Sequence, residues 1–166
     1  MSFEQEYIVR IRTDPETGSR LGEEWRLNSS EQLLHREDGP ALQEWSPKSG
    51  IKVRECYLLH GEYDKNGGPS KTERDPNTGT ITLEEWRKCG ALYREGGKPA
   101  YIEIDPETGV VVIEGYYEGG VEHRLNGPAV IVRDRESGRI ISESYYVNGD
   151  MFEPPGGDDA LDATPN

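Results

Sequence analysis

The chain has 166 residues, enough for one domain, but only 32 of them are Leu, Ile, Val or Phe. Its 32 acidic residues outnumber 19 basic ones and give a formal net charge of -13. That balance disfavours direct contact with nucleic acid or anionic lipid, because both require a cationic face. The sequence contains no apolar run near 18 residues and no charged-then-apolar leader. We therefore expect no membrane span, no signal peptide and a cytoplasmic location.

One motif recurs five times with a period of 29 to 32 residues. In each copy a Gly is followed five residues later by Glu and seven residues later by Trp or Tyr. The glycines are Gly18, Gly50, Gly79, Gly109 and Gly138, the glutamates are Glu23, Glu55, Glu84, Glu114 and Glu143, and the aromatic residues are Trp25, Tyr57, Trp86, Tyr116 and Tyr145. The aliphatic content alone borders on that of disordered chains, but a fixed period is the signature of a repeat architecture. It indicates an extended binding surface and not a single catalytic cleft.

The elements predicted in chain order are five β-hairpins, which begin near Tyr7 and end near Met151. The first turn reads Asp-Pro-Glu-Thr-Gly at residues 14–18, and similar turns end at the other four repeat glycines. Pro presets the backbone of a type I turn, Asp or Ser caps it, and Gly takes the left-handed position. A second turn follows the aromatic residue by four residues in the later copies, at Gly61, Gly90, Gly120 and Gly149.

The predicted fold is all-β, with tandem β-hairpin repeats in an elongated antiparallel sheet over residues 1–152. Residues 153–166 carry four acids and no base, and we expect them to form a disordered acidic tail. Without this tail the body still has 28 acids and 19 bases, so the acidity belongs to the repeats.

Alternate residues of a strand share a face, so positions three, five and seven after each turn glycine are expected on one side. The aromatic column then forms either a packed spine or an exposed stripe for a ligand. The Glu column forms either an ion-pair ladder, neutralised by Arg36, Arg94 and Arg124 or by backbone N–H groups, or an acidic stripe for a partner. Successive glutamates are about 10 Å apart, too far to share a metal ion or act as an acid–base pair.

No catalytic constellation, metal site or cofactor motif is found. Cys56 and Cys89 occupy different repeat positions, so neither a disulfide framework nor a metal box is predicted. His35 and His123 share a repeat position, where packing of a turn is expected. If the Glu column is neutralised internally, the acids left for a partner are those outside it, and we name Glu24, Glu85, Glu103 and Glu107.

Residues 34–41 read Leu-His-Arg-Glu-Asp-Gly-Pro-Ala, and residues 145–149 read Tyr-Tyr-Val-Asn-Gly. These strings resemble the bacterial and phage variant of the MORN repeat, and the resemblance covers residues from about 20 to 150. It implies a sheet of consecutive β-hairpins without enzymatic activity. Some relatives of this kind, the YwqK-type proteins, are described as antitoxins, and MORN repeats elsewhere are associated with protein scaffolding or membrane attachment.

Together these features predict a non-enzymatic module that neutralises or scaffolds a basic protein partner, in the manner of an antitoxin, an immunity protein or an anti-defence inhibitor. One alternative is an acidic mimic of nucleic acid that inhibits a DNA- or RNA-binding protein. A further alternative is a membrane-associated scaffold of the MORN type, which the acidity disfavours.

Overall fold

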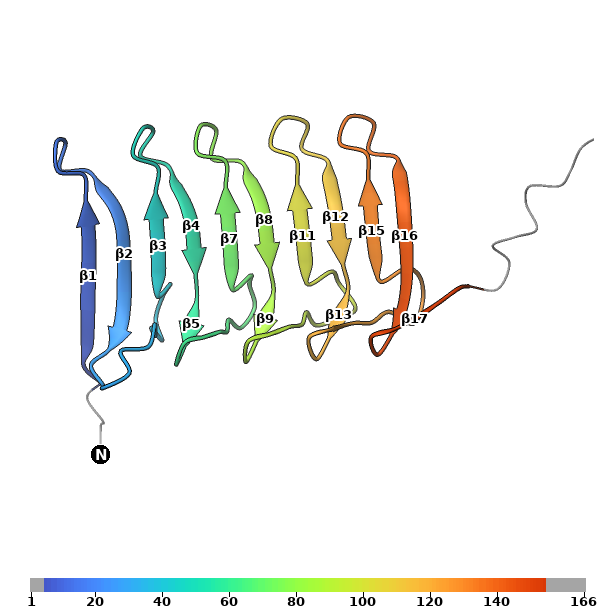
Figure 1. Ribbon diagram of the computed structural model, residues 1–166, viewed down its shortest axis with the longest axis horizontal. Coiled ribbons are helices and arrows are strands. Elements are labelled where there is room, and N and C mark those ends of the chain that lie inside the picture. The colour runs from blue at the N-terminus through green and yellow to red at the C-terminus, as the bar shows by residue number, and fades with distance from the viewer. Residues whose placement is uncertain (1–4, 155–166) are drawn as a thin grey trace, which may run out of the picture.

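The computed structural model describes residues 5–154 and places them in strands, turns and loops, with no helix in that range. Eleven strands form one antiparallel sheet in the order β1-β2-β3-β4-β7-β8-β11-β12-β15-β16-β17. Figure 1 shows a single elongated layer in which the hairpins follow one another in chain order. The predicted all-β fold of tandem hairpins is confirmed. The predicted tail lies outside the described residues, apart from its first two.

From the second copy on, each hairpin has a long upper part and a short lower part, whereas the first hairpin has only the long pair (Figure 1). The upper parts pair β1 (Tyr7–Thr13) with β2 (Arg20–Leu27), β3 (Leu42–Trp45) with β4 (Lys52–Cys56), β7 (Lys71–Arg74) with β8 (Ile81–Glu85), β11 (Tyr101–Ile104) with β12 (Val111–Gly115), and β15 (Val130–Arg133) with β16 (Ile140–Val147). The lower parts pair β5 (Leu58–Leu59) with β6 (Glu62–Tyr63), β9 (Arg87–Lys88) with β10 (Ala91–Leu92), and β13 (Tyr117–Glu118) with β14 (Val121–Glu122). In the last copy β17 (Asp150–Phe152) pairs with the end of β16.

The five upper turns lie along one edge of the sheet, which we call the turn edge; the opposite edge, with the lower hairpins and loops, is the loop edge (Figure 1). All five turn glycines have positive φ, between 68° and 78°, as predicted from the turn motif. The carboxylate of Asp105 accepts the Thr108 N–H at 2.9 Å and the Glu107 N–H at 3.1 Å. These hydrogen bonds hold the pKa of Asp105 below its ordinary value.

A β-bulge follows every upper turn and changes the predicted alternation. The strand register shifts once in each of the five hairpins, and the third residue after the turn glycine has no partner across the pair. Val53, for example, is skipped between the pairs Trp45↔Lys52 and Glu44↔Arg54. Position three therefore does not belong to the same alternating series as positions five and seven. The sequence did not reveal the bulge because the residue that it inserts is present in every copy.

Positions five and seven lie on one side of the sheet, which we call the aromatic face. The hydrogen bond that the Trp25 indole donates to the Glu23 carboxylate shows that the two positions share this side. Along this face each of the first four repeat aromatics pairs through its backbone with a small residue of the following hairpin. The backbone N–H of Trp86, for example, donates to the Ala100 carbonyl at 2.7 Å. The small residues are Ala41, Ser70, Ala100 and Ala129, all with 0% exposure. The row thus alternates large and small side chains, which explains why Ala or Ser follows each repeat proline.

The other side of the sheet, the back face, carries a lattice of ion pairs over its first half. Arg54 contacts Glu44 at 2.9 Å and Glu73 at 3.1 Å, and Lys71 contacts Glu73 at 3.1 Å. In the cross-strand register the same row continues through Leu83 and Glu103 to Ile113 and Val132. Glu103 is the one charged residue of this row beyond Glu73, so the back face carries fewer charges along its second half.

The turn assignment predicts a backbone cost at Gly109. A Cβ at Gly109 would meet no heavy atom within 4 Å, so a substitution there tests only its φ of 73°. Gly109→Val is expected to lower the free energy of unfolding by about 1 kcal/mol or more, because a β-branched residue is strained at positive φ. Gly109→Asn should lose less, since Asn tolerates the left-handed region.

Urea denaturation of both variants, with Glu107→Val in the same turn as control, measures this cost. Equal midpoints for Gly109→Val and the parent would show that the turn is wrongly assigned.

Candidate functional site

Each of the first four repeat aromatics carries a cation over its ring. The Arg36 guanidinium lies 4.0 Å from the centroid of the Trp25 ring. The corresponding pairs, all at 3.7 Å, are Lys65 over Tyr57, Arg94 over Trp86 and Arg124 over Tyr116. We call these four side chains the stacked cations. They come from the loops that lead from one hairpin to the next, and they cover aromatic rings that a single-layer sheet would otherwise leave open to water.

The Glu column is neutralised mainly by other residues than those predicted. Of the three expected partners only Arg36 approaches a column glutamate, at 3.8 Å from Glu23, while Arg94 and Arg124 stack on rings instead. The closer contacts come from strand residues next to the bulges: Arg20 to Glu23 at 2.5 Å, Lys52 and Arg74 to Glu55 at 2.9 and 3.0 Å, and Arg133 to Glu114 at 2.6 Å. Among the described residues Glu84 and Glu143 have no ion pair. For Glu84, the strand position that holds Arg74 or Arg133 in other copies holds Ile104.

The four acids expected to remain for a partner do not form one patch. Glu85 is only 8% exposed and pairs with Arg87 at 2.6 Å and Lys71 at 3.4 Å, so it does not meet the expectation of an unpaired acid. Glu24 pairs with Arg26 at 2.9 Å, and Glu103 accepts a hydrogen bond from the Tyr101 hydroxyl. Glu107 alone is fully exposed, and it lies on the turn edge.

In three of the four copies the residue before the stacked cation accepts a hydrogen bond that fixes the next lower turn. His35 Nδ1 accepts the His60 N–H at 2.9 Å, and His123 Nδ1 accepts the Asn148 N–H at 3.1 Å. In the second copy the Asp64 carboxylate accepts the Cys89 N–H at 2.9 Å. The donor residues begin turns in which they have positive φ, from 47° to 54°. This loop position thus aligns the next lower turn in the first, second and fourth copies.

Lys65 was not predicted as one of the stacked cations, because the prediction named only arginines at this repeat position. The signal was present: Lys65, Arg94 and Arg124 each follow their repeat aromatic by eight residues.

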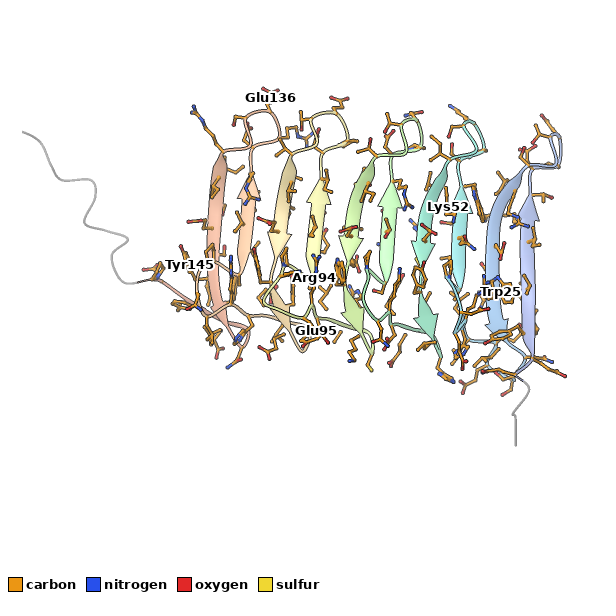
Figure 2. All side chains as sticks on the ribbon, turned by 180° about the vertical axis from the view of Figure 1, so that it is seen from behind. Trp25, Lys52, Arg94, Glu95, Glu136 and Tyr145 are labelled. Carbon is orange, nitrogen blue, oxygen red and sulfur yellow. The ribbon has the colours of Figure 1, made fainter. Side chains whose placement is uncertain are left out.

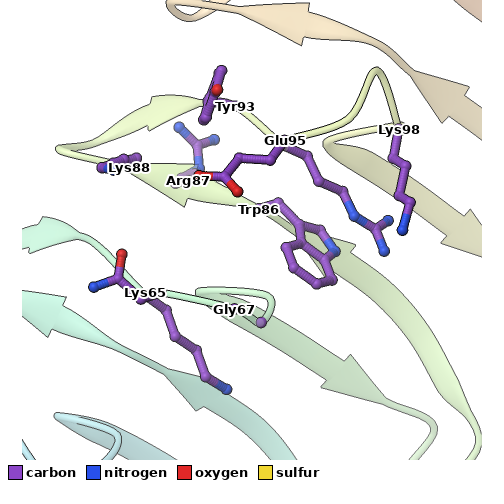
Figure 3. A pocket seen from close by; sticks show the side chains of 11 residues that line it. Lys65, Gly67, Trp86, Arg87, Lys88, Tyr93, Glu95 and Lys98 are labelled. Atoms are coloured by element: carbon purple, nitrogen blue, oxygen red, sulfur yellow. The ribbon is translucent and has the colours of Figure 1, made fainter.

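Grooves open between successive loops on the aromatic face. One, of about 280 Å³, lies between the loops that follow β6 and β10 and is lined by Lys65, Asn66, Gly67, Gly68, Trp86, Arg87, Lys88, Tyr93, Arg94, Glu95 and Lys98. Figure 3 shows Lys65 on one side of this groove and Lys98 on the other, with Trp86 between them. A neighbouring groove of about 410 Å³ includes Arg94, Lys98, Tyr116 and Arg124. Figure 2 places Trp25, Arg94 and Tyr145 in the lower half of the sheet and Glu136 at the turn edge.

Reactive groups are not gathered elsewhere in the part of the chain that the structure describes. Residues 5–154 hold no group of three or more His, Cys, Asp or Glu side chains that could hold a metal ion. Cys56 is buried, Cys89 is exposed, and both are free thiols. Burial raises the pKa of the Cys56 thiol, and Tyr63, whose hydroxyl contacts it, has its pKa raised to about 12 mainly by burial. No helix of the described range is long and apolar enough to cross a membrane.

No protein-family model, curated protein or solved structure matches this chain.

Removing the ring under a stacked cation in the middle of the row is expected to destabilise more than removing the last ring. Trp86→Ala should lower the free energy of unfolding by about 3 kcal/mol, because the ring packs under Arg94 with hairpins on both sides. Tyr145→Ala should cost roughly half as much. Its ring has a single aromatic neighbour, Phe152, at 5.9 Å.

Chemical denaturation of both variants checks this difference, and Trp86→Phe, which keeps a ring for Arg94, serves as the matched control. Equal losses at the central and the terminal ring would contradict a row of nearest-neighbour contacts.

Stability is expected to depend on the protonation of His35, which is 1% exposed. Burial lowers the pKa of His35 below its ordinary value of 6.5, the neighbouring His60 lowers it further, and Glu37 opposes the shift. The unfolded chain therefore binds more protons than the folded chain between the lowered pKa and 6.5. The stability that this site contributes is present above pH 6.5 and is lost as the pH falls through the lowered pKa.

His35→Asn retains a side-chain acceptor for the His60 N–H but does not titrate. Melting temperatures from pH 7.5 down to pH 5 should fall more steeply for the parent than for this variant. His123→Asn is the control for general acid effects. Parallel curves for the parent and His35→Asn would refute a role of His35 in the pH dependence.

Proposed function

We propose that this chain is a non-enzymatic repeat protein of the MORN type that binds a protein partner along its sheet and neutralises or scaffolds that partner. The observation that carries the proposal is the repetition of one arrangement, a cation stacked on an aromatic ring, in four successive hairpins. Repetition along a single layer produces a long surface whose sites are about 10 Å apart. Such a surface suits an extended protein contact.

The MORN assignment is supported by the roles of its motif residues. In the segment from His35 to Ala41, the His accepts a backbone hydrogen bond from the next turn, the Arg covers the ring, and the buried Ala separates two rings. The segment from His123 to Ala129 repeats these three roles. The motif residues therefore serve the architecture, and the residues that vary between copies are the ones available for a partner.

For a basic partner, the turn edge is the surface that charge favours. Its exposed acids are Glu16, Glu107 and Glu136, and none of them forms an ion pair within the described residues. About half of the strand acids, such as Glu55 and Glu114, are already neutralised by neighbouring arginines and lysines. Unpaired acids on an exposed edge accelerate association with a basic surface, since long-range attraction acts on the encounter.

A pull-down from the native host, followed by reconstitution of a purified complex of defined stoichiometry, tests the proposed function. Recovery of only nucleic acid or only lipid would refute it, whereas recovery of a DNA- or RNA-binding protein whose binding of nucleic acid this chain blocks would support the nucleic-acid mimic.

Charge reversal on the turn edge is expected to slow binding of the basic partner without unfolding the protein. Glu107→Lys and Glu16→Lys, tested separately, should each lower the association rate a few-fold at 50 mM salt and leave the melting temperature unchanged. Glu107→Gln, which removes one charge without adding another, should have a smaller effect. Surface plasmon resonance between 50 and 300 mM salt gives the rates. Association rates that change neither with the substitutions nor with salt would refute the electrostatic role of this edge.

A further inference from the structure

Four basic side chains of the loop edge differ from most other arginines and lysines in having no carboxylate partner. Within residues 5–154 eleven arginines and lysines form ion pairs with carboxylates within 4.0 Å: Arg12, Arg20, Arg26, Arg36, Lys52, Arg54, Lys71, Arg74, Arg87, Arg133 and Arg135. Within residues 5–154, Lys65, Lys88, Arg94 and Lys98 form none, although the chain has 32 acids for 19 bases. All four line the groove of about 280 Å³ around Trp86.

The groove thus concentrates unneutralised positive charge in an otherwise acidic protein. Among its lining residues the one acid is Glu95, which is exposed and which Figure 3 shows beside Arg87 and Trp86. Arg94 is held over the Trp86 ring at 3.7 Å and by its hydrogen bond to the Pro99 carbonyl at 3.1 Å. A guanidinium fixed in this way keeps its remaining N–H groups for a ligand, at little cost in side-chain entropy.

A second, independent observation is the indole of Trp86. Its Nε1 atom is buried and has no hydrogen-bond partner, whereas the equivalent Trp25 Nε1 donates to Glu23. A buried donor without an acceptor costs free energy, so an acceptor oxygen that displaced the side chains over the ring would gain by pairing with it. The groove therefore combines an unpaired donor with several cations, which together fit an oxygen-bearing anion.

The size of the site and the charge around it favour a short acidic peptide over a nucleic acid. A long polyanion on the loop edge would also pass Glu62, Glu95 and Glu118, which are exposed there, and the net charge of -13 would repel it. A segment with two or three carboxylates needs only this one groove. Its carboxylates match the guanidinium and ammonium groups that line the groove.

We propose that the groove around Trp86 binds the carboxylate side chains of an acidic peptide segment of the partner protein. This inference rests on the proposed function, since it assigns the chemistry of one contact with that partner. It places the acid-binding contact on the loop edge, opposite the acidic turn edge (Figure 1). A partner that engages both edges presents a basic surface to the turns and an acidic segment to the loops.

Binding of a fluorescein-labelled hexaglutamate peptide to the purified full chain, followed by fluorescence anisotropy at 20 mM salt, tests the inference. Saturable binding is expected, with an affinity that falls as salt rises. Lys98→Glu should weaken it roughly tenfold, because an exposed cation of the groove becomes an acid. Lys48→Glu makes the same change of charge at an exposed turn-edge residue and should have little effect. The indole N–H resonance of Trp86, assigned with Trp86→Phe, should shift on addition of the peptide.

Three results would overturn the inference: no saturable binding of hexaglutamate, equal losses in Lys98→Glu and Lys48→Glu, or an unmoved indole resonance of Trp86. Preferential binding of an oligothymidylate of six nucleotides, or of phosphatidylserine vesicles, would also overturn it in favour of another ligand class. A negative result with hexaglutamate would not affect the recovery of a protein partner by pull-down. The proposed role of the groove and the proposed function can therefore be refuted separately.

Discussion

A single-layer sheet lacks a second layer against which to bury its aromatic residues, and this constraint shapes the rest of the structure. A cation from each loop covers the aromatic ring beneath it, as Arg94 covers Trp86 at 3.7 Å from the ring centroid. The ring gains cover, and the guanidinium keeps its edge in water. Since every loop must return over its own hairpin to bring the cation into place, loop length and direction follow from this contact.

The same contact dictates what surrounds it. Residues between neighbouring rings must be small, and Ala41 and Ala100 are both 0% exposed. The proline before each of them starts the strand that brings the small residue into register with the ring. In three of the four loops the residue before the cation, such as His35, accepts a hydrogen bond from the next lower turn. Stability therefore comes from nearest-neighbour contacts, as in other repeat proteins.

Charge is divided between neutralisation within the sheet and exposure at its edges. Acids on both faces of the strands pair with nearby arginines and lysines, which leaves exposed acids on the turn edge and unneutralised cations in the groove around Trp86. The overall composition does not show this division, because a net charge of -13 suggests a uniformly acidic surface. Arrangement, and not the total, decides which partner chemistry each edge favours.

The sequence by itself determined the repeat, the hairpins and their turns, because glycine at positive φ and the Asp or Ser cap act within a few residues. It also indicated the aromatic column, since strand periodicity is local. Only the tertiary structure decided the ion pairs and the groove. Whether Arg94 would meet a glutamate or a ring depended on the path of its loop, and the burial of Glu85 depended on Lys71 from the neighbouring strand and on Arg87. Such contacts join residues across strands, and their geometry is set by the β-bulges and by loop closure, which a single sequence does not encode as a local pattern.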